Sequence, residues 1–177
     1  MPLKKVYAFD VDQNASSRFA TELSSELKID IEPVRLLSLA IRNSDVCVTC
    51  TSATEFFVHK RDVAPGTFIV AVGADDLHKQ EIDPALMASV KVVADHLEQV
   101  CSSGDTHHAI ARGLMRKEDV YAELSEVVAG KKSGRTSDGE IIVFDSTGVA
   151  IEDAAAAIVV YEKALSAGIG NYFEFTA

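Results

Sequence analysis

Hydrophobic and polar positions along the chain alternate in two distinct patterns. Short apolar runs typical of buried strands occupy residues 5–9, 45–50, 67–72, 90–94 and 140–144. Helical spacing of apolar residues occurs between them, over 15–27 and more briefly over 84–88. Near-continuous apolar strands separated by helices are typical of a parallel sheet that is covered by helices on both faces. The pattern therefore predicts an α/β fold with a doubly wound parallel sheet.

The last helical pattern, from Val149 to about Leu165, differs from the others because apolar residues lie almost all round it. Such a helix is buried on several sides, and one face of a sheet cannot cover it. We therefore expect the sheet domain to comprise residues 1–148, and residues 149–177 to pack against additional protein. Residues Tyr172–Phe175 alternate in polarity, which predicts a final strand.

Composition and charge narrow the class of protein and of partner. With 177 residues, 47% of them hydrophobic, the chain is long and apolar enough to form one folded domain. The net charge is −10 and the Lys and Arg residues are scattered, which argues against a nucleic-acid partner. No apolar run reaches the ~18 residues that span a bilayer, so we expect no membrane partner. The lack of a signal-peptide pattern and the three cysteines, an odd number, favour a reducing cytoplasm.

Two aspartates follow predicted strands, and ligands bind at the carboxyl ends of strands in sheets of this kind. Asp10 ends the strand 5–9, where an acid can accept hydrogen bonds from the ribose hydroxyls of a dinucleotide. A strand-end turn shared with Asp12 is the commoner reason for such a residue. Asp75 follows the strand 67–72, where it can act as a general acid or base if partial burial raises its pKa. Helix capping or turn formation by Asp75 and Asp76 explains the same position equally well.

Hydroxyl groups are predicted at the same edge of the sheet. Thr51 and Ser52 follow the strand 45–50, where their hydroxyls can bond a cofactor or cap a helix. The segment Asp145-Ser146-Thr147-Gly148 lies between the strand 140–144 and the apolar helix, which predicts an N-cap. A helix N-terminus at that point is also a natural site for an anion or a carboxamide.

Other groups of reactive residues are interpreted as structural. Cys47 and Cys50 lie three residues apart in a predicted strand and point to opposite faces, so they do not readily share a metal ion or a disulfide. Cys101 and the two adjacent histidines that follow it lack the spacing of a zinc motif. Residues 130–135 form a basic, glycine-rich turn that departs from the P-loop pattern, and we expect an exposed connector. No metal site is predicted.

Several short motifs occur in a characteristic order. They are Thr49-Cys50-Thr51-Ser52, Pro65-Gly66-Thr67, Val72-Gly73-Ala74-Asp75, Lys79-Gln80-Glu81, Gly134-Arg135, Phe144-Asp145-Ser146-Thr147-Gly148 and Ile151-Glu152-Asp153. Taken together, they resemble the ornithine cyclodeaminase/mu-crystallin family, and within it the archaeal-type alanine dehydrogenase branch. The resemblance extends over nearly the whole chain from about Lys5.

The resemblance implies a Rossmann-like domain that binds NAD(H). It also implies hydride transfer between the nicotinamide and the α-carbon of a small amino acid or its imine, as in alanine dehydrogenase, ornithine cyclodeaminase or ketimine reductase. By resemblance, Asp75 is the catalytic aspartate. Asp10 binds the ribose and favours NAD over NADP, and Thr51, Ser52 and Ser146 line the nicotinamide pocket.

The family fold also includes two structural parts that we do not expect within this chain. The family's first Rossmann strand and its Gly-x-Gly-x-x loop should precede Lys5, and no GxGxxG occurs in the sequence. The family's N-terminal domain, which grips the substrate and forms the dimer, is also expected outside this chain, with residues 149–177 packing on it. We therefore expect an NAD-dependent enzyme that is a homodimer when intact, and a chain that is inactive alone. A non-catalytic, crystallin-like protein that binds a ligand or a partner is the alternative.

Overall fold

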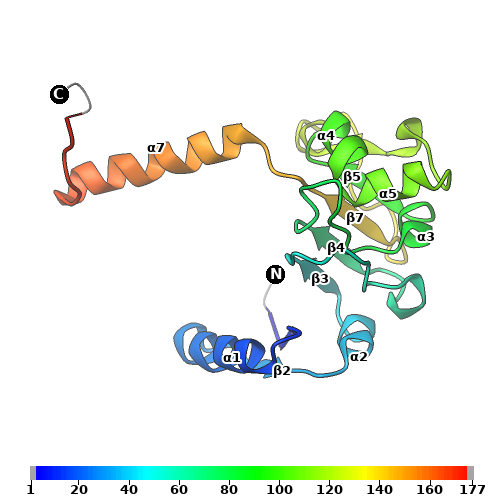
Figure 1. The fold of residues 1–177 in the computed structure, drawn as a ribbon, viewed down its shortest axis with the longest axis horizontal. Helices are drawn as coiled ribbons and strands as arrows, with labels where there is room; N and C mark the ends of the chain where they lie inside the picture. The colour runs from blue at the N-terminus through cyan, green and yellow to red at the C-terminus, as the bar shows by residue number, and fades with distance from the viewer. Residues whose placement is uncertain (1–2, 175–177) are drawn as a thin grey trace.

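The computed structural model describes residues 3–174 of the chain. The strands are β1 (Val6–Ala8), β2 (Ile31–Pro33), β3 (Val46–Thr49), β4 (Phe68–Ala71), β5 (Lys91–Ala94), β6 (Ala122–Glu123) and β7 (Ile142–Asp145). The α-helices are α1 (Gln13–Leu27), α2 (Leu37–Arg42), α3 (Pro84–Met87), α4 (Leu97–Ser103), α5 (Asp105–Ala111), α6 (Leu124–Val128) and α7 (Ala150–Ala167). Short 3-10 turns are η1 (Lys60–Asp62) and η2 (Lys117–Asp119). Figure 1 shows a body around the larger sheet, a smaller unit containing α1, and α7 extending away from both.

The larger sheet has five parallel strands in the order β3-β4-β7-β5-β6. Its central strand, β7, is the last of the five in sequence, and Ile142 pairs with Phe68 on one side and with Lys91 on the other. Each strand in this sheet is parallel to its neighbours, so the carboxyl ends of the strands lie at one edge. This arrangement confirms the predicted α/β class with a parallel sheet.

One face of the larger sheet carries the core of the protein. Ile69, Val92 and Val143 point into a cluster that includes residues of α3 and α5, and each of the three is at most 1% exposed. On the opposite face, Val46 and Val48 remain 37% and 60% exposed. A cavity of about 600 Å³ also opens there, lined by apolar side chains of four strands and of α6. Among the described residues, α6 lies over only part of this second face.

The strands β1 and β2 pair in parallel and form a separate two-stranded sheet with α1 packed on it. Ala8, Ala20 and Ile31 make a small core of their own. The helix starts where the Asp12 side chain accepts a hydrogen bond from the Asn14 backbone N–H at 2.9 Å. Asp10 therefore belongs to a unit that shares no sheet with the strands carrying the other candidate site residues.

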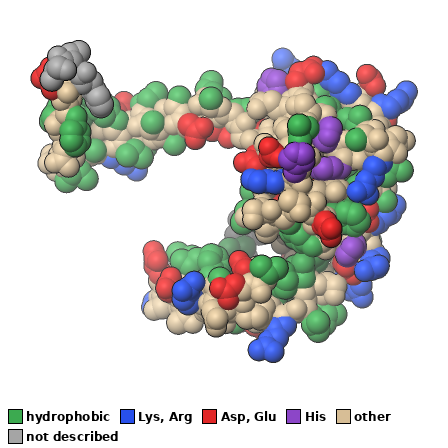
Figure 2. Space-filling view, viewed as in Figure 1, with side chains coloured by type: hydrophobic (Ala, Val, Ile, Leu, Met, Phe, Trp, Pro, Cys, Tyr) green, Lys and Arg blue, Asp and Glu red, His purple; other side chains and the backbone are tan. Residues whose placement is uncertain are grey.

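The helix α7 extends away from the sheet, and none of its residues is buried (Figure 1). Hydrophobic side chains are visible along this projecting arm in Figure 2. The large apolar residues exposed on it are Ile151, Ile158, Val159, Val160, Tyr161 and Leu165. The predicted final strand is wrong over Tyr172–Glu174, which form no strand, and Phe175 lies outside the described residues. Within residues 3–174, no helix is long and apolar enough to cross a membrane.

Candidate functional site

Three aspartates stand at the carboxyl ends of three neighbouring strands. Asp75 follows β4, Asp145 ends β7 and Asp95 follows β5. Because these strands are adjacent and parallel, the three residues lie along one edge of the sheet, the edge at which ligands bind in open α/β sheets. Their environments differ, since Asp75 is exposed, Asp95 is half-buried and Asp145 is fully buried. The three carboxylates therefore differ in their access to solvent and in the chemistry they can perform.

Asp75 is the accessible carboxylate of this edge. Its Oδ1 accepts a hydrogen bond from the Lys79 ammonium at 2.5 Å, and its side chain is 52% exposed. The hydrogen bond from Lys79 lowers the pKa of Asp75 below its ordinary value. The partial burial that we expected to raise this pKa is therefore absent. The geometry leaves an ionised carboxylate, paired with an ammonium, in the loop after β4.

Asp95 organises the loop between β7 and α7. Its Oδ2 accepts hydrogen bonds from the Ser146 hydroxyl at 2.8 Å and from the backbone N–H groups of Thr147 and Gly148 at 2.9 and 2.8 Å. The N-cap of α7 is Val149, which makes no side-chain capping bond. The predicted N-cap at residues 145–148 is therefore wrong, because α7 begins only at Ala150 and the Ser146 hydroxyl bonds Asp95 instead of the helix. The Ser146 hydroxyl donates to Asp95, so its oxygen is oriented as an acceptor.

Asp145 and Asp105 form a buried acidic pair behind that loop. Asp145 Oδ2 accepts from the backbone N–H and the hydroxyl of Thr106 at 2.8 and 2.6 Å, and both aspartates are 0% exposed. Desolvation raises the pKa of Asp145 to about 6. Desolvation and, next, the charge of Asp145 raise the pKa of Asp105 to about 8. Asp105, which has the higher pKa of the two, therefore holds its proton at neutral pH.

Glu81 joins the loops that leave β3 and β4. Its Oε1 accepts from the backbone N–H and the hydroxyl of Thr51 at 2.6 and 2.7 Å, and its Oε2 accepts from the Gly73 N–H at 3.0 Å. The Glu81 side chain is fully buried. Thr51 therefore lies at the site edge, as predicted, but its hydroxyl hydrogen is already donated to a carboxylate.

Two predicted site residues are less constrained. Asp10 is exposed, and its Oδ1 accepts from the Asp12 backbone N–H at 2.8 Å, which is the strand-end turn described above. Ser52 is exposed in the loop after β3. The structure thus brings Thr51, Asp75 and Ser146 to one edge of one sheet, with Ser52 beside Thr51, whereas Asp10 lies on the separate unit.

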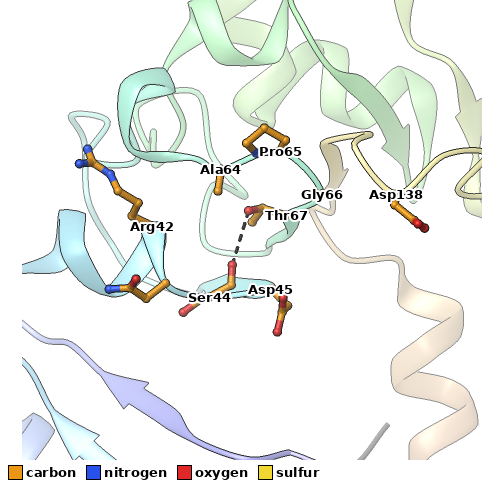
Figure 3. A pocket seen from close by; sticks show the side chains of 9 residues that line it. Arg42, Ser44, Asp45, Ala64, Pro65, Gly66, Thr67 and Asp138 are labelled. Carbon is orange, nitrogen blue, oxygen red and sulfur yellow. Dashed lines mark hydrogen bonds between the residues drawn. The ribbon is translucent and has the colours of Figure 1, made fainter.

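A polar cavity of about 330 Å³ lies at the opposite edge, where the strands begin (Figure 3). Asp45 precedes β3 and Thr67 precedes β4, and both line it together with Arg42 and Asp138. The Thr67 hydroxyl donates to the Ser44 carbonyl oxygen at 3.5 Å, the dashed line in Figure 3. None of the predicted site residues borders this cavity, so it is not part of the candidate site.

The described residues contain no cluster of three or more His, Cys, Asp or Glu side chains that could hold a metal ion. The three cysteines are free, and burial raises the pKa of Cys47 to about 11. The thiolate form that binds metals is therefore disfavoured at Cys47. Residues 130–135 are exposed, as predicted for a connector.

A parallel α/β sheet with carboxylates and hydroxyls gathered at its carboxyl edge places this protein in the Rossmann-like class. Comparison with known sequences then gives the particular group. The chain belongs to the ornithine cyclodeaminase/mu-crystallin family, which matches residues 1–168.

Several curated relatives are similar over almost the whole chain. The alanine dehydrogenase of Archaeoglobus fulgidus is 40% identical over 172 residues, which are 97% of this chain and 52% of that protein. The iminosuccinate reductase of Paracoccus denitrificans is 39% identical over 171 residues, again 97% of this chain and 52% of the relative. The chain therefore spans about half the length of these relatives.

Solved structures show the same relationship. An archaeal alanine dehydrogenase dimer with bound NAD superposes with a TM-score of 0.90 at 40% identity, over 98% of this chain and 53% of that one. The Δ1-pyrroline-2-carboxylate reductase of Thermococcus litoralis, solved with NADH and L-proline, gives a TM-score of 0.92 at 34% identity. That match covers 96% of this chain and 53% of the reductase chain. The fold seen here is thus the fold of one half of such proteins.

Proposed function

We propose that this chain provides the nucleotide-binding half of an NAD-dependent oxidoreductase that acts on a small amino acid or its imine. The observation that carries the proposal is the position of Thr51, Asp75 and Ser146. They follow or lie beside the ends of β3, β4 and β7, which are consecutive strands of one parallel sheet. This edge is where a dinucleotide and its substrate meet in the Rossmann class. Relatives of both the dehydrogenase and the imine reductase type support the reaction class.

The side chains at this edge fit a polar cofactor. The hydroxyl oxygens of Thr49 and Thr147 are buried there without a hydrogen-bond partner, so they have unused bonding capacity. Ser146 is oriented by Asp95 and Thr51 by Glu81. Each hydroxyl oxygen also accepts one local backbone N–H, from Gly148 at 3.4 Å and from Ala53 at 3.2 Å, and keeps a second lone pair for the nicotinamide side of NAD. NAD, when bound, supplies the acceptor for the hydride that leaves the substrate α-carbon. In this proposal, Asp10 bonds the adenosine ribose and Ser52 lines the nicotinamide pocket beside Thr51.

Asp75 is the proton acceptor in this proposal. The ion pair with Lys79 keeps its carboxylate charged, which is the form that can take a proton from a substrate amine or from water. When the α-carbon loses a hydride, the amine nitrogen loses a proton, and the product is an imine. The same carboxyl returns the proton when the reaction runs toward the amine.

The second part of the proposal concerns the apolar surfaces that are exposed in this structure. The side chains of α7 and of Val46 and Val48 are exposed here, and soluble proteins rarely leave apolar surface of this extent in water. We assign these surfaces to packing against the substrate-binding and dimerisation domain of the intact enzyme, with residues 1–148 as the cofactor domain. The homodimeric state is proposed from the dimeric archaeal alanine dehydrogenase.

The test is a pair of neighbouring substitutions in the intact enzyme. Asp75→Asn keeps the size of the side chain and removes the base, so turnover should fall by about 10²–10⁴-fold. Asp76→Asn is the matched control, because Asp76 is exposed and its carboxylate accepts a local bond from the His78 N–H at 2.9 Å. Near-normal amino-acid-dependent NAD reduction by the Asp75 variant would contradict the assignment. Tight NADH binding without turnover in the unmodified enzyme would instead favour a non-catalytic, crystallin-like binding protein.

A further inference from the structure

Glu81 is a fully buried carboxylate whose role is not explained by the fold alone. Its side chain accepts three hydrogen bonds, and all three come from two loops at the candidate site. Two are donated by Thr51, from its N–H and its hydroxyl, and one by the Gly73 N–H. Charge-assisted bonds of this kind are about twice as strong as neutral ones. The carboxylate therefore ties the loop after β3 to the loop after β4.

The hydrogen bonds between β3 and β4 continue past the last paired residues of the two strands. Thr49 pairs with Ala71 at the ends of β3 and β4, and the Val72 N–H still donates to the Thr49 carbonyl at 2.9 Å. Two residues past each strand end, Thr51 and Gly73 no longer pair with each other. The Glu81 carboxylate lies between them and accepts from both, so it fixes the spacing of the two loops.

Gly73 shows how closely the carboxylate fills this position. A Cβ at residue 73 would lie 2.3 Å from Glu81 Oε1 and 2.6 Å from the Thr51 nitrogen. Neither contact is possible for real atoms, so a side chain at this position would push the two loops apart. Asp75 follows in the same loop, and its N–H donates to the Gly73 carbonyl at 3.2 Å. The position of Asp75 therefore depends on the position of Gly73.

The backbone of Glu81 is held independently of its side chain. Asp105 Oδ1 accepts from the N–H groups of Glu81 and Ile82 at 2.8 and 2.9 Å. The Glu81 carbonyl accepts from the N–H groups of Phe57 and Val58, both at 3.0 Å. Removing the carboxylate would thus leave the Glu81 backbone in place and release only the two site loops.

We propose that Glu81 is a positioning residue for the reaction, which holds Thr51 against the nicotinamide side and Asp75 at the substrate side of the same site. This inference rests on the proposed function. It assigns no contact between Glu81 and either ligand. It predicts that the distance between the hydroxyl of Thr51 and the carboxylate of Asp75 is set by one buried acid.

The first test measures turnover in the intact enzyme. Glu81→Gln keeps the volume but places an amide N–H₂ against the donors of Thr51 or Gly73. We expect kcat to fall by about 10²-fold, with a much smaller change in the KM for the amino acid. Thr51→Val, which removes one of the three donors, should give a smaller loss in the same direction. Asp62→Asn is the control, since Asp62 is also buried but pairs with Arg42 away from the site.

The second test measures amide hydrogen exchange, first in the unmodified chain and then in the variant. In the unmodified chain, the amide hydrogens of Thr51 and Gly73 should be protected from exchange although they lie outside any strand or helix. In the Glu81→Gln variant, these two amides should lose protection by at least about 10-fold, while the amides of β4 and β7 keep theirs. Rapid exchange of the Gly73 amide in the unmodified chain would overturn the inference whether or not the variant folds.

Asp75→Asn separates the two proposals. If that variant stays active, the proposed function fails, whatever Glu81 does. If it is inactive while Glu81→Gln turns over like Asp62→Asn, the proposed function stands and the positioning role of Glu81 is wrong. A rise in the KM of the Glu81→Gln variant, with its kcat unchanged, would also contradict the positioning role.

Discussion

Asp105 and Asp145 are two fully buried carboxyl groups that each leave one oxygen without a hydrogen-bond partner, Oδ2 of Asp105 and Oδ1 of Asp145. Their other oxygens are well bonded, to the N–H groups of Glu81 and Ile82 and to Thr106. Desolvation is the main cause that raises both pKa values, to about 8 and about 6. The folded protein therefore retains protons that the unfolded chain releases near the ordinary aspartate value of 3.8.

This relationship predicts that stability falls as the pH rises from about 5 to about 8. The folded-state pKa of Asp105 is raised above its unfolded value, so unfolding in this window releases a proton and higher pH favours the unfolded state. One proton contributes at most about 1.4 kcal/mol of unfolding free energy per pH unit. Glu140, whose pKa is lowered to about 2, titrates below this window. Urea unfolding at several pH values measures the slope.

Asp105→Asn should flatten that slope. The asparagine keeps an oxygen for the N–H groups of Glu81 and Ile82, and it replaces the proton-bearing oxygen by an amide that cannot titrate. Asp62→Asn, in which a buried carboxylate paired with Arg42 is changed, should leave the slope as it is. An unchanged slope in the Asp105 variant would show that the retained proton lies elsewhere.

The intact enzyme should prefer NAD to NADP. A carboxylate at Asp10 accepts hydrogen bonds from a free 2′-hydroxyl and repels a 2′-phosphate. The ratio of kcat/KM for the two cofactors measures the preference, and Asp10→Ser should reduce it. Asp30→Ser, on the same small unit beside β2, is a suitable control. A preference for NADP in the unmodified enzyme would mean that Asp10 does not face the ribose.

The 177-residue chain by itself should bind NADH weakly. Tight pyrophosphate binding in this fold uses backbone N–H groups of a glycine-rich loop, and no GxGxxG occurs in this sequence. Each missing charge-assisted hydrogen bond costs roughly 1.5–3 kcal/mol of binding free energy. Isothermal titration calorimetry with NADH measures the affinity. Micromolar binding would show that other residues replace the loop.

The chain alone should also self-associate through α7. Ile158 and Tyr161 are 58% and 64% exposed on this helix, among other large apolar side chains. Ile158→Glu should reduce association in sedimentation experiments, because a charge on this face opposes its burial. Glu162→Gln on the same helix should have little effect. A chain that stays monomeric at all concentrations would contradict this prediction.

The sequence predicted the elements that have a long apolar signal. The strands β1, β3, β4 and β5 fall within predicted runs, and β7 extends one residue past its run, to Asp145. The helices α1 and α7 begin and end within two residues of their predicted bounds. The strands β2 and β6 were not predicted, because three and two residues are too few to show a period. At 172–175, by contrast, a strand was predicted where residues 172–174 form none, since alternating polarity alone does not supply a neighbouring strand to pair with.

The candidate site was predicted where strand ends carry reactive side chains. Asp75, Thr51 and Ser146 follow that rule, and Asp95 follows it as well after the run 90–94, so this signal was present and unused. Glu81 and Asp105 follow no strand of the larger sheet. Their roles arise mainly from contacts between distant parts of the sequence, such as those of Glu81 with Thr51, 30 residues away, and with Asp105, 24 residues away. Local patterns do not contain such contacts.

The central position of β7 also has a consequence for the order in which the protein can fold. β4 and β5 do not pair with each other, because β7 occupies the place between them. During synthesis, the chain before residue 142 can form the β3–β4 and β5–β6 pairs only as separate pieces. Pairings that join distant segments form slowly, since a long loop must close before any contact stabilises it. Completion of this sheet is therefore a late, cooperative event that waits for residues 142–145 to be made.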